Sequence, residues 1–478
     1  MSAPAIRTRF APSPTGFLHV GGLRAALYNF LFARHEGGTF ILRIEDTDQA
    51  RLVEGALENI IATMRWAGLE YDEGPMKEGD CGPYIQSQRL DLYRAHAAQL
   101  IADGHAYHCF CTQQRLDDLR ARQVEQKQPP MYDRRCRSLS EADVADNLAA
   151  GMPHVLRQKI PLTGELIVKD LVRGDVHFQF RTLDDHVLMK SDGFPTYHLA
   201  NIVDDHHMRI SHVIRGEEWL PSTPRHVLLY QAFGWEPPQF AHLPLLLNAD
   251  RTKLSKRQGD VAAESYRDNG YLPEALVNFI ALLGWNPGTE QEIFSLDEMI
   301  NLFSLEHVHK AGAVFDTEKL RWMNAQYLKA LPLQEITDGV IPFMQAAGFD
   351  TSDRARTEHI VNAVRTHLHC YSEIGEHVGI FFGDRPAPES PEAAAILGSE
   401  ASRRVLSLLC AELESLAEFT PESFLLTLKA AGAASGVKGK ELYMPVRIAL
   451  TGRTHGPELP LIAEALGRDA VIRRLEAA

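Results

Sequence analysis

Cysteine is scarce in this sequence, which has six cysteines among 478 residues. They lie at positions 81, 109, 111, 136, 370 and 410 and show no regular spacing. Secreted domains that depend on disulfides carry cysteine at a much higher density. Structural disulfides are therefore not expected, and the cytosol is the predicted compartment.

Long hydrophobic runs are also missing. No stretch of 18 apolar residues occurs, and the first ten residues, MSAPAIRTRF, contain no apolar core of signal-peptide length. Nothing therefore predicts a membrane anchor or an export signal. No internal repeat of solenoid length is evident either, which argues against a stacked-repeat architecture.

Positive charge is in the minority, because 63 acidic side chains outnumber 49 Lys and Arg and give a formal net charge of −14. This balance excludes a protein that coats nucleic acid without selectivity, since phosphate binding depends on lysine and arginine. Local basic faces, such as residues 134–137 (RRCR), are still compatible with it. Hydrophobic residues make up 45% and charged residues 23%, as in folded globular proteins, and the length predicts roughly three to five domains.

The stretch 9–22, RFAPSPTGFLHVGG, connects a predicted strand to a predicted helix. Residues 6–10 alternate apolar and polar, and two prolines and a glycine then end the strand. Apolar residues recur at helical spacing from 21 to 34, and the β-branched, apolar stretch 39–44 predicts a second strand. The sequence thus predicts a βαβ unit whose polar, glycine-bearing first turn suits a nucleotide phosphate.

Two short motifs resemble those of a known enzyme class. HVGG (residues 19–22) resembles the HIGH motif of class I aminoacyl-tRNA synthetases, and KLSKR (residues 253–257) resembles their KMSKS loop. Their order and their separation of about two hundred residues also fit that class. Five further stretches read like one family within it: RFAPSPTG (9–16), RIEDTD (43–48), YHLANIVDDH (197–206), VIRGEEW (213–219) and FDTEKLRWMN (315–324). The chain therefore resembles the bacterial glutamyl-tRNA synthetase family over nearly its whole length.

The apolar pattern and the resemblance together predict an α/β fold: a Rossmann-like class I catalytic domain with an inserted acceptor-binding domain, followed by an all-helical C-terminal anticodon-binding half. Residues 242–248 read as an apolar strand, and residues 357–373 read as one helix. The predicted limits are 1–80 and 191–250 for the two catalytic halves, 81–190 for the insertion, 251–328 for the KMSKS loop and stem-contact domain, and 329–478 for the helical region, with a subdomain boundary near 385–392.

The two motifs carry the candidate catalytic residues. His19 lies at a helix N-terminus, where its imidazole can stabilise charge growing on the α-phosphate of ATP, although a histidine in such a turn can also simply cap its own helix. Lys253 and Lys256 belong to a loop that can close over a triphosphate and neutralise charge on the leaving pyrophosphate. The resemblance implies these ATP-binding residues: His19, Gly21, Gly22, Lys253, Ser255 and Lys256.

Two arginines at predicted strand ends are candidates for binding a dicarboxylic substrate. Arg9 and Arg215 suit this role because the planar guanidinium can hold a carboxylate bidentately and because ligands bind at the carboxyl ends of parallel strands; a surface salt bridge is the alternative. The resemblance implies that glutamate is contacted by Arg9, Ala11, Ser13, Glu45, Tyr197 and Arg215, with Glu45 taking the ammonium group. Which arginine holds which carboxylate stays open.

Three cysteines in the predicted insertion have the spacing of a metal knuckle. Cys109 and Cys111 are one residue apart and are followed by Cys136, so their thiolates can share an ion such as zinc. The zinc-binding form of the resembled family has a histidine two residues after the last cysteine, where this chain has Ser138. Tyr132 is a candidate fourth ligand, as in the related enzyme that glutamylates queuosine. Structural zinc and three reduced thiols stay open as alternatives.

The resemblance implies a two-step reaction. The α-carboxylate of L-glutamate attacks the α-phosphate of ATP, assisted by Mg²⁺, to give glutamyl-adenylate and pyrophosphate. The 2′-hydroxyl at the 3′ end of tRNA(Glu) then accepts the glutamyl group. Members of the family need bound tRNA for the first step, and no side chain becomes covalent, so positioning and charge stabilisation carry the rate. A monomer is expected.

Four rival functions are disfavoured. Glutaminyl-tRNA synthetases have Pro-Glu-Pro-Asn where this chain has PSPT at residues 12–15, and their anticodon half is built from β-barrels. The queuosine-glutamylating relative lacks an anticodon half. A non-catalytic tRNA-binding paralogue would be expected to have lost His19 or Lys256, and a small-molecule nucleotidyltransferase would not need the helical C-terminal region.

One position bears on tRNA choice. Discriminating members of the family place an arginine against the third anticodon base, at which tRNA(Glu) and tRNA(Gln) differ. That position falls near His367 in this chain, with Arg365 two residues away. Because a neutral histidine lacks the charge and fork of arginine, we expect tRNA(Glu) to be charged best and tRNA(Gln) to a measurable degree.

Overall fold

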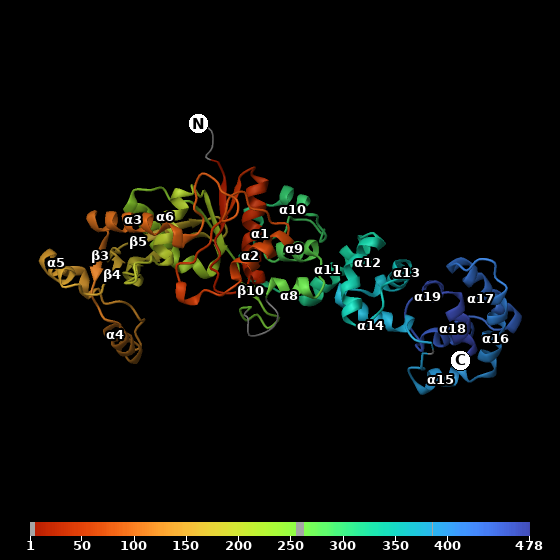
Figure 1. The fold of residues 1–478 in the computed structure, drawn as a ribbon. Helices are drawn as coiled ribbons and strands as arrows, with labels where there is room; N and C mark the ends of the chain where they lie inside the picture. The colour runs from red at the N-terminus through yellow and green to blue at the C-terminus, as the bar shows by residue number, and fades with distance from the viewer. Residues whose placement is uncertain (1–4, 255–261, 385) are drawn as a thin grey trace. The chain divides into compact units, whose positions relative to one another are not determined.

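The structure is a computed structural model that describes residues 5–254, 262–384 and 386–478. The chain forms two compact units, one of residues Met1–Ser265 and Leu276–Asp316 and the other of residues Tyr266–Ala275 and Thr317–Ala478. Figure 1 shows strands in the N-terminal part of the chain and helices throughout. Among the described residues, no helix is both long and apolar enough to cross a membrane.

The first unit begins with the predicted βαβ unit. Strands β1 (Arg7–Phe10) and β2 (Thr39–Leu42) are parallel, with Arg7 opposite Thr39 and Phe10 opposite Leu42, and helix α1 (Val20–His35) connects them. All four residues of β1 are buried, although the first three are polar. The polar side chains can be buried because Arg7 pairs with Glu73 and Arg9 pairs with Asp205.

The second half of the sheet consists of four strands in the order β6-β5-β9-β8. β8 (His212–Gly216) and β9 (Gln239–Leu243) are parallel along their full length, and β8 lies beside β1, where the Ser211 N–H donates to the Arg7 carbonyl at 3.0 Å. β5 (Glu165–Asp170) joins β9 in parallel and pairs antiparallel with β6 (Gly174–Gln179). Two strands from the range 81–190 thus extend the sheet that carries β8 and β9.

A separate antiparallel sheet in the order β3-β4-β7 lies in the range of the predicted insertion. Its strands are β3 (Ala106–Cys109), β4 (Val155–Gln158) and β7 (Val187–Met189). Helices α4 (Gln113–Glu125) and α5 (Glu141–Ala149) lie between β3 and β4 in the chain, and neither helix buries a residue. Both therefore present side chains that other molecules can reach.

The remaining helices of the N-terminal part follow in chain order, and the division between the two units falls within α8 and α9. Their bounds are α2 (Ala56–Trp66), α3 (Leu90–Ala102), α6 (Tyr197–His207), α7 (Thr223–Phe233), α8 (Ala263–Asp268), α9 (Pro273–Ala281) and α10 (Leu296–Leu302). α6 buries seven of its residues, among them two consecutive aspartates. That burial of charge is the unusual feature of this unit.

Two sequence-based predictions of single elements are wrong. The strand predicted over residues 242–248 is interrupted after Leu243, because Pro244 has no N–H to donate, and it resumes as β10 (Leu246–Leu247), which pairs with β11 (Ala313–Val314). The helix predicted over residues 357–373 ends early, as α13 (Arg354–Val364). Beyond it the Tyr371 N–H donates to the Gly270 carbonyl rather than to a carbonyl within the same helix.

The described residues of the second unit form helices and their connections and contain no strand. Besides α13 it contains α11 (Thr317–Ala330), α12 (Leu333–Ala346), α14 (Ile374–Val378), α15 (Pro391–Leu397), α16 (Glu400–Glu414), α17 (Pro421–Ser435), α18 (Lys440–Thr451), α19 (Leu459–Leu466) and α20 (Arg468–Glu476). One apolar core runs from α12 and α13 to α16, α18 and α19. The buried Arg474 adds a polar link, because its guanidinium donates to the carbonyls of Ile380, Leu450 and Gly383.

Candidate active site

A cleft of about 830 Å³ opens at the carboxyl ends of β1 and β8 in the first unit. Ligands of open α/β sheets bind at such strand ends. The lining includes every residue that the sequence analysis assigned to glutamate: Arg9, Ala11, Ser13, Glu45, Tyr197 and Arg215. It also includes the described members of the ATP set: His19, Gly21, Gly22 and Lys253. Ser255 and Lys256 lie outside the described residues.

His19 caps helix α1 and faces the cleft at the same time. Its Nδ1 accepts a hydrogen bond from the Gly22 N–H at 3.0 Å, which satisfies one of the free donors at the helix start. Because Nδ1 accepts, a neutral ring carries its proton on Nε2, where it can donate to an oxyanion. A Cβ on Gly21 would lie 3.1 Å from the imidazole ring, so a larger residue there would require the ring to shift by a few tenths of an ångström.

A buried network of charges lies beneath the cleft. Asp205 accepts from Arg9 Nε at 3.0 Å and from Arg43 Nη1 at 2.6 Å. Arg43 Nη2 also donates to Glu45 Oε1 at 2.9 Å and to Asn201 Oδ1 at 2.7 Å. Arg43 is fully buried, so its charge depends on these carboxylates for compensation.

The same network gives its carboxylates opposite pKa shifts. Burial raises the pKa of Glu45, although Arg43 partly opposes that shift. Burial acts in the same direction on Asp205, but there Arg9 and Arg43 prevail and lower the pKa. Asp205 is therefore the permanent anion of the network, whereas Glu45 would gain from a further cation beside it, such as an ammonium group.

Asp204, the neighbour of Asp205 on α6, anchors a second set of donors. It accepts from Arg89 Nε at 2.7 Å, from Gln86 Nε2 at 2.9 Å and from Tyr93 OH at 2.8 Å. These contacts connect the start of α3 to α6. The two aspartates therefore fix the segments on both sides of the cleft floor.

The sequence analysis did not assign Arg43, Asn201 or Asp205 to the site. A signal was present, because Asn201 and Asp205 are four residues apart and so share one face of a helix. Arg43 lies in the RIEDTD stretch, two residues before Glu45. Spacing alone does not reveal that these segments meet, since Arg43 and Asp205 are 162 residues apart.

Arg215 is held in a different way from Arg9. Its guanidinium donates to His242 Nε2 at 3.0 Å, to Tyr197 OH at 3.1 Å and to Thr223 Oγ1 at 2.9 Å. Within the described part of the chain, none of its hydrogen-bond partners is a carboxylate. Trp219, which the sequence analysis did not assign, also lines the cleft, and its ring centroid lies 4.3 Å from that of Tyr197.

Lys253 reaches the cleft from the segment after β10. It pairs with Leu247 in an isolated antiparallel bridge, and the Leu254 N–H donates to the Leu246 carbonyl at 2.9 Å. The lysine side chain itself is exposed. The backbone contacts thus place the exposed ammonium group at the rim of the cleft.

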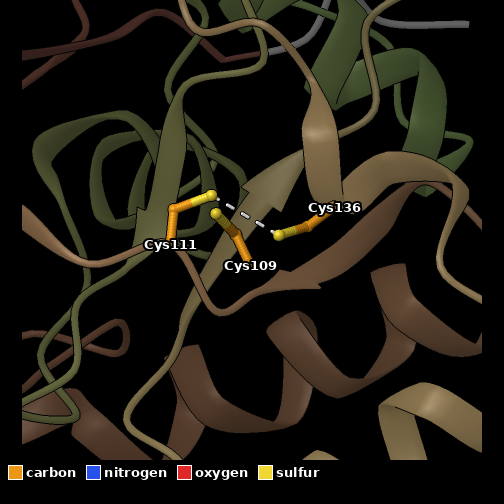
Figure 2. Close-up of side chains that lie close together, drawn as sticks. All are labelled: Cys109, Cys111 and Cys136. Atoms are coloured by element: carbon orange, nitrogen blue, oxygen red, sulfur yellow. Dashed lines mark hydrogen bonds between the residues drawn. The ribbon is translucent and has the colours of Figure 1, made fainter. Parts of the chain in front are cut away.

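The three candidate metal ligands converge at the end of β3, as Figure 2 shows. The sulfur atoms of Cys109, Cys111 and Cys136 all lie within 4.8 Å of one another. The Tyr132 hydroxyl points into the same cluster, 3.3 Å from Cys109 Sγ and 3.5 Å from Cys111 Sγ. A hydrogen bond from Cys136 lowers the pKa of Cys109, so the cluster favours a thiolate. Ser138 is exposed.

The candidate anticodon residues lie in a short 3₁₀ turn, Arg365–His367, that follows α13. His367 is exposed and its ring stacks on that of His377, with centroids 5.9 Å apart. Arg365 is half-buried. Both side chains belong to the helical second unit.

Comparison with known families agrees with this geometry. The model described as "tRNA synthetases class I (E and Q), catalytic domain" matches residues 5–322, and an anticodon binding domain model matches residues 335–478. The chain belongs to the class I glutamyl- and glutaminyl-tRNA synthetases. The family assignment and the fold class predicted from the sequence, a class I catalytic domain followed by a helical anticodon-binding domain, are thereby confirmed.

Relatives of this synthetase match it from end to end. It is 47% identical to the glutamate–tRNA ligase of Clostridioides difficile, covering 98% of each chain, and 47% identical to that of Alkaliphilus metalliredigens, covering 99% of this chain and 98% of the relative. A crystal structure of a glutamate tRNA ligase from Elizabethkingia meningosepticum in complex with its amino acid superposes with a TM-score of 0.92 at 40% identity, covering 99% of both chains.

We expect Asp205→Asn to destabilise the synthetase by about 3 to 5 kcal/mol, because Arg9 and Arg43 would keep their buried charge without this carboxylate. Urea denaturation followed by tryptophan fluorescence measures the change. Asp91→Asn is the matched control, since its pair with Arg94 is exposed on α3 and should contribute little. Equal effects of the two substitutions would contradict the prediction.

Proposed function

We propose that this synthetase is a glutamate–tRNA ligase, which activates L-glutamate with ATP and transfers it to the 3′ end of tRNA(Glu), giving AMP and pyrophosphate. The observation that carries the proposal is the match to enzymes named glutamate–tRNA ligase over nearly the full length of both chains. The glutaminyl-type alternative predicts a β-barrel anticodon half, whereas the described residues of the second unit are helical.

The cleft supplies groups suited to activation. Glu45 can take the substrate ammonium, and Arg9 and Arg215 offer guanidinium groups for its carboxylates. The His19 Nε2–H and the Lys253 ammonium can stabilise charge as it develops on the phosphates of ATP. Mg²⁺ bound with ATP would neutralise triphosphate charge. The protein residues act by holding two substrates in line, which converts a bimolecular step into a unimolecular one.

We also propose a division of the chain into parts that bind different regions of the tRNA. Residues 1–80 and 191–250 form the catalytic halves in this proposal, residues 81–190 bind the acceptor end, residues 251–328 contact the stem, and residues 329–478 bind the anticodon, with a division near 385–392. Because β5 and β6 join β9 in the catalytic sheet, we assign acceptor binding within residues 81–190 to the β3-β4-β7 sheet together with α4 and α5.

We expect His19→Ala and Lys256→Ala each to slow glutamate activation by about 3 kcal/mol, as removal of one preorganised donor does, with little effect on glutamate binding. Pyrophosphate exchange measured with tRNA(Glu) present reports the activation step. Wild-type exchange in both variants would contradict the assignment of the two motifs.

Two variants separate catalysis from folding at this position. His19→Asn keeps an acceptor for the Gly22 N–H, and asparagine is a favourable helix cap, but it removes the Nε2 donor. We therefore expect it to melt like the wild type and to be as slow as His19→Ala. His105→Ala, in an exposed turn, is the control that should leave exchange unchanged.

The cysteine cluster fits a structural zinc ion. Three sulfur atoms within 4.8 Å and a tyrosine hydroxyl in the same cluster give four donors of the kind and number that a closed zinc site uses, although tyrosine is a rare ligand. The cluster lies at the end of β3, in a segment with a small apolar core of its own. Bound zinc would add to the stability of that segment.

We expect one zinc ion per chain in protein purified without chelator, and loss of zinc together with a lower melting temperature in Cys136→Ser. Elemental analysis and thermal denaturation measure the two effects. Cys410→Ser, which replaces a cysteine of the second unit outside the cluster, should change neither the zinc content nor its sensitivity to chelator. Zinc well below one per chain would leave the three cysteines as reduced thiols.

We further propose that tRNA(Gln) is charged slowly, because the exposed His367 offers a base one hydrogen bond without the charge of arginine. We expect His367→Arg to increase the preference for tRNA(Glu), since one good base contact contributes roughly 1 to 3 kcal/mol. Parallel aminoacylation of purified tRNA(Glu) and tRNA(Gln) measures the preference, and His359→Arg on α13 is the control. Discrimination by the wild type above about a thousandfold, which is about 4 kcal/mol, would show that Arg365 or another residue reads the base.

A further inference from the structure

Arg215 lies in a frame of uncharged acceptors that leaves it one N–H for a ligand. A guanidinium has five N–H groups. Its Nε donates to His242, one Nη2–H donates to Thr223, and Nη1 donates to Tyr197 OH at 3.1 Å and to His226 Nδ1 at 3.3 Å. Among the described residues no acceptor for the second Nη2–H is present, and Arg215 lines the cleft.

His242 is itself held from behind by a carboxylate. Its Nε2 accepts from Arg215 at 3.0 Å, and its Nδ1 lies 2.5 Å from Asp170 Oδ2, so the proton of the neutral ring is on Nδ1 and donates to Asp170. The other oxygen of Asp170 accepts from the backbone N–H groups of Val172 and Arg173 at 3.0 and 2.8 Å. His242 is fully buried. The ring therefore has one orientation and one tautomer.

A second histidine pair supports the other side of the guanidinium. His226 Nδ1 faces Arg215, and His226 Nε2 lies 3.0 Å from His198 Nδ1, so the His226 proton is on Nε2 and donates to His198. Burial, with Arg215 adding to it, lowers the pKa of His226, and burial also lowers the pKa of His242. Both rings are thus neutral at pH 7 and keep the lone pair that accepts from Arg215.

We propose that His242, backed by Asp170, and His226, backed by His198, are positioning residues that fix Arg215 in the orientation that binds a carboxylate of the amino-acid substrate. The carboxylate is held by the one remaining Nη2–H together with the Tyr197 O–H, rather than by the full guanidinium fork. Affinity for the amino acid therefore depends on histidines that do not touch it. This inference rests on the proposed function and extends it to a layer of side chains behind the cleft.

Two substitutions of His242 separate its two hydrogen bonds. His242→Asn can still donate toward Asp170, because the asparagine amide takes the place of Nδ1, but it offers no acceptor to Arg215. His242→Gln places an amide oxygen near the position of Nε2 and keeps that acceptor. His212→Asn is the matched control, a buried histidine on the neighbouring strand β8 that contacts Ser211 instead.

Pyrophosphate exchange with tRNA(Glu) present gives the KM for glutamate and the KM for ATP of each variant. We expect His242→Asn to raise the KM for glutamate by about tenfold to a hundredfold, the usual loss for a hydrogen bond to a charged group, while the KM for ATP stays within about twofold. His242→Gln should restore most of the loss. In Asp170→Asn combined with His242→Asn, the effect should not exceed that of His242→Asn alone, because Asp170 acts through His242.

The inference is overturned if the KM for glutamate in His242→Asn matches that in His212→Asn, or if the KM for ATP rises equally. If His242→Asn does not fold, His226→Gln tests the other positioning histidine, because its amide can still reach His198 but offers Arg215 no acceptor at the position of Nδ1. An unchanged KM for glutamate in that variant overturns the inference as well. Failure of the wild type to use glutamate at all would instead refute the proposed function, so the two failures are distinguishable.

Discussion

The ion pairs of Asp205 with Arg9 and Arg43 hold together the three segments that surround the cleft floor. Removing an aspartate and two arginines from water is costly, and close pairing with good geometry is what compensates that cost. Arg9 comes from β1, Arg43 follows β2, and Asp205 lies on α6, so each segment can bury its charge only where the other two are also present. Asp204 extends the same constraint to the start of α3 through Arg89. The cleft floor is thus specified by charge as well as by apolar packing.

The two candidate substrate-binding arginines of the cleft, Arg9 and Arg215, differ in their partners. Arg9 already faces the carboxylate of Asp205, so part of its charge is compensated before any ligand binds. Arg215 is surrounded by a hydroxyl, a phenol and two neutral imidazoles. Its charge is therefore more available to an incoming carboxylate than that of Arg9, and its orientation is set by groups that do not compete for that charge. Arg9 is thus held by a charged partner that also stabilises the fold, whereas Arg215 is held by uncharged partners that leave its charge for a ligand.

His19 illustrates how a single residue can satisfy local structure and chemistry together. Its Nδ1 caps α1, and that bond determines which nitrogen of a neutral ring carries the proton. The two interpretations of this histidine, helix cap and phosphate ligand, are therefore compatible.

The cysteine cluster is separate from the cleft. It forms the centre of its own small apolar core, and among the described residues it shares no member with the cleft lining.

The sequence by itself determined the family, the βαβ start and the candidate ligand-binding residues that were found to line the cleft, although it missed Trp219. These features depend on short motifs and on periodicity within one segment. It also predicted that the three cysteines form one cluster, because they lie within a single short segment of the chain. Only the tertiary structure decided the partners of those residues: Arg43 and Asp205 are 162 residues apart, and Asp170 supports His242 from 72 residues away. Beyond the end of α13 at Val364, the Tyr371 N–H likewise pairs with a distant group, the Gly270 carbonyl. Periodicity reports which face of an element is apolar, whereas the partner of a buried charge or a free N–H is chosen by how separate elements pack.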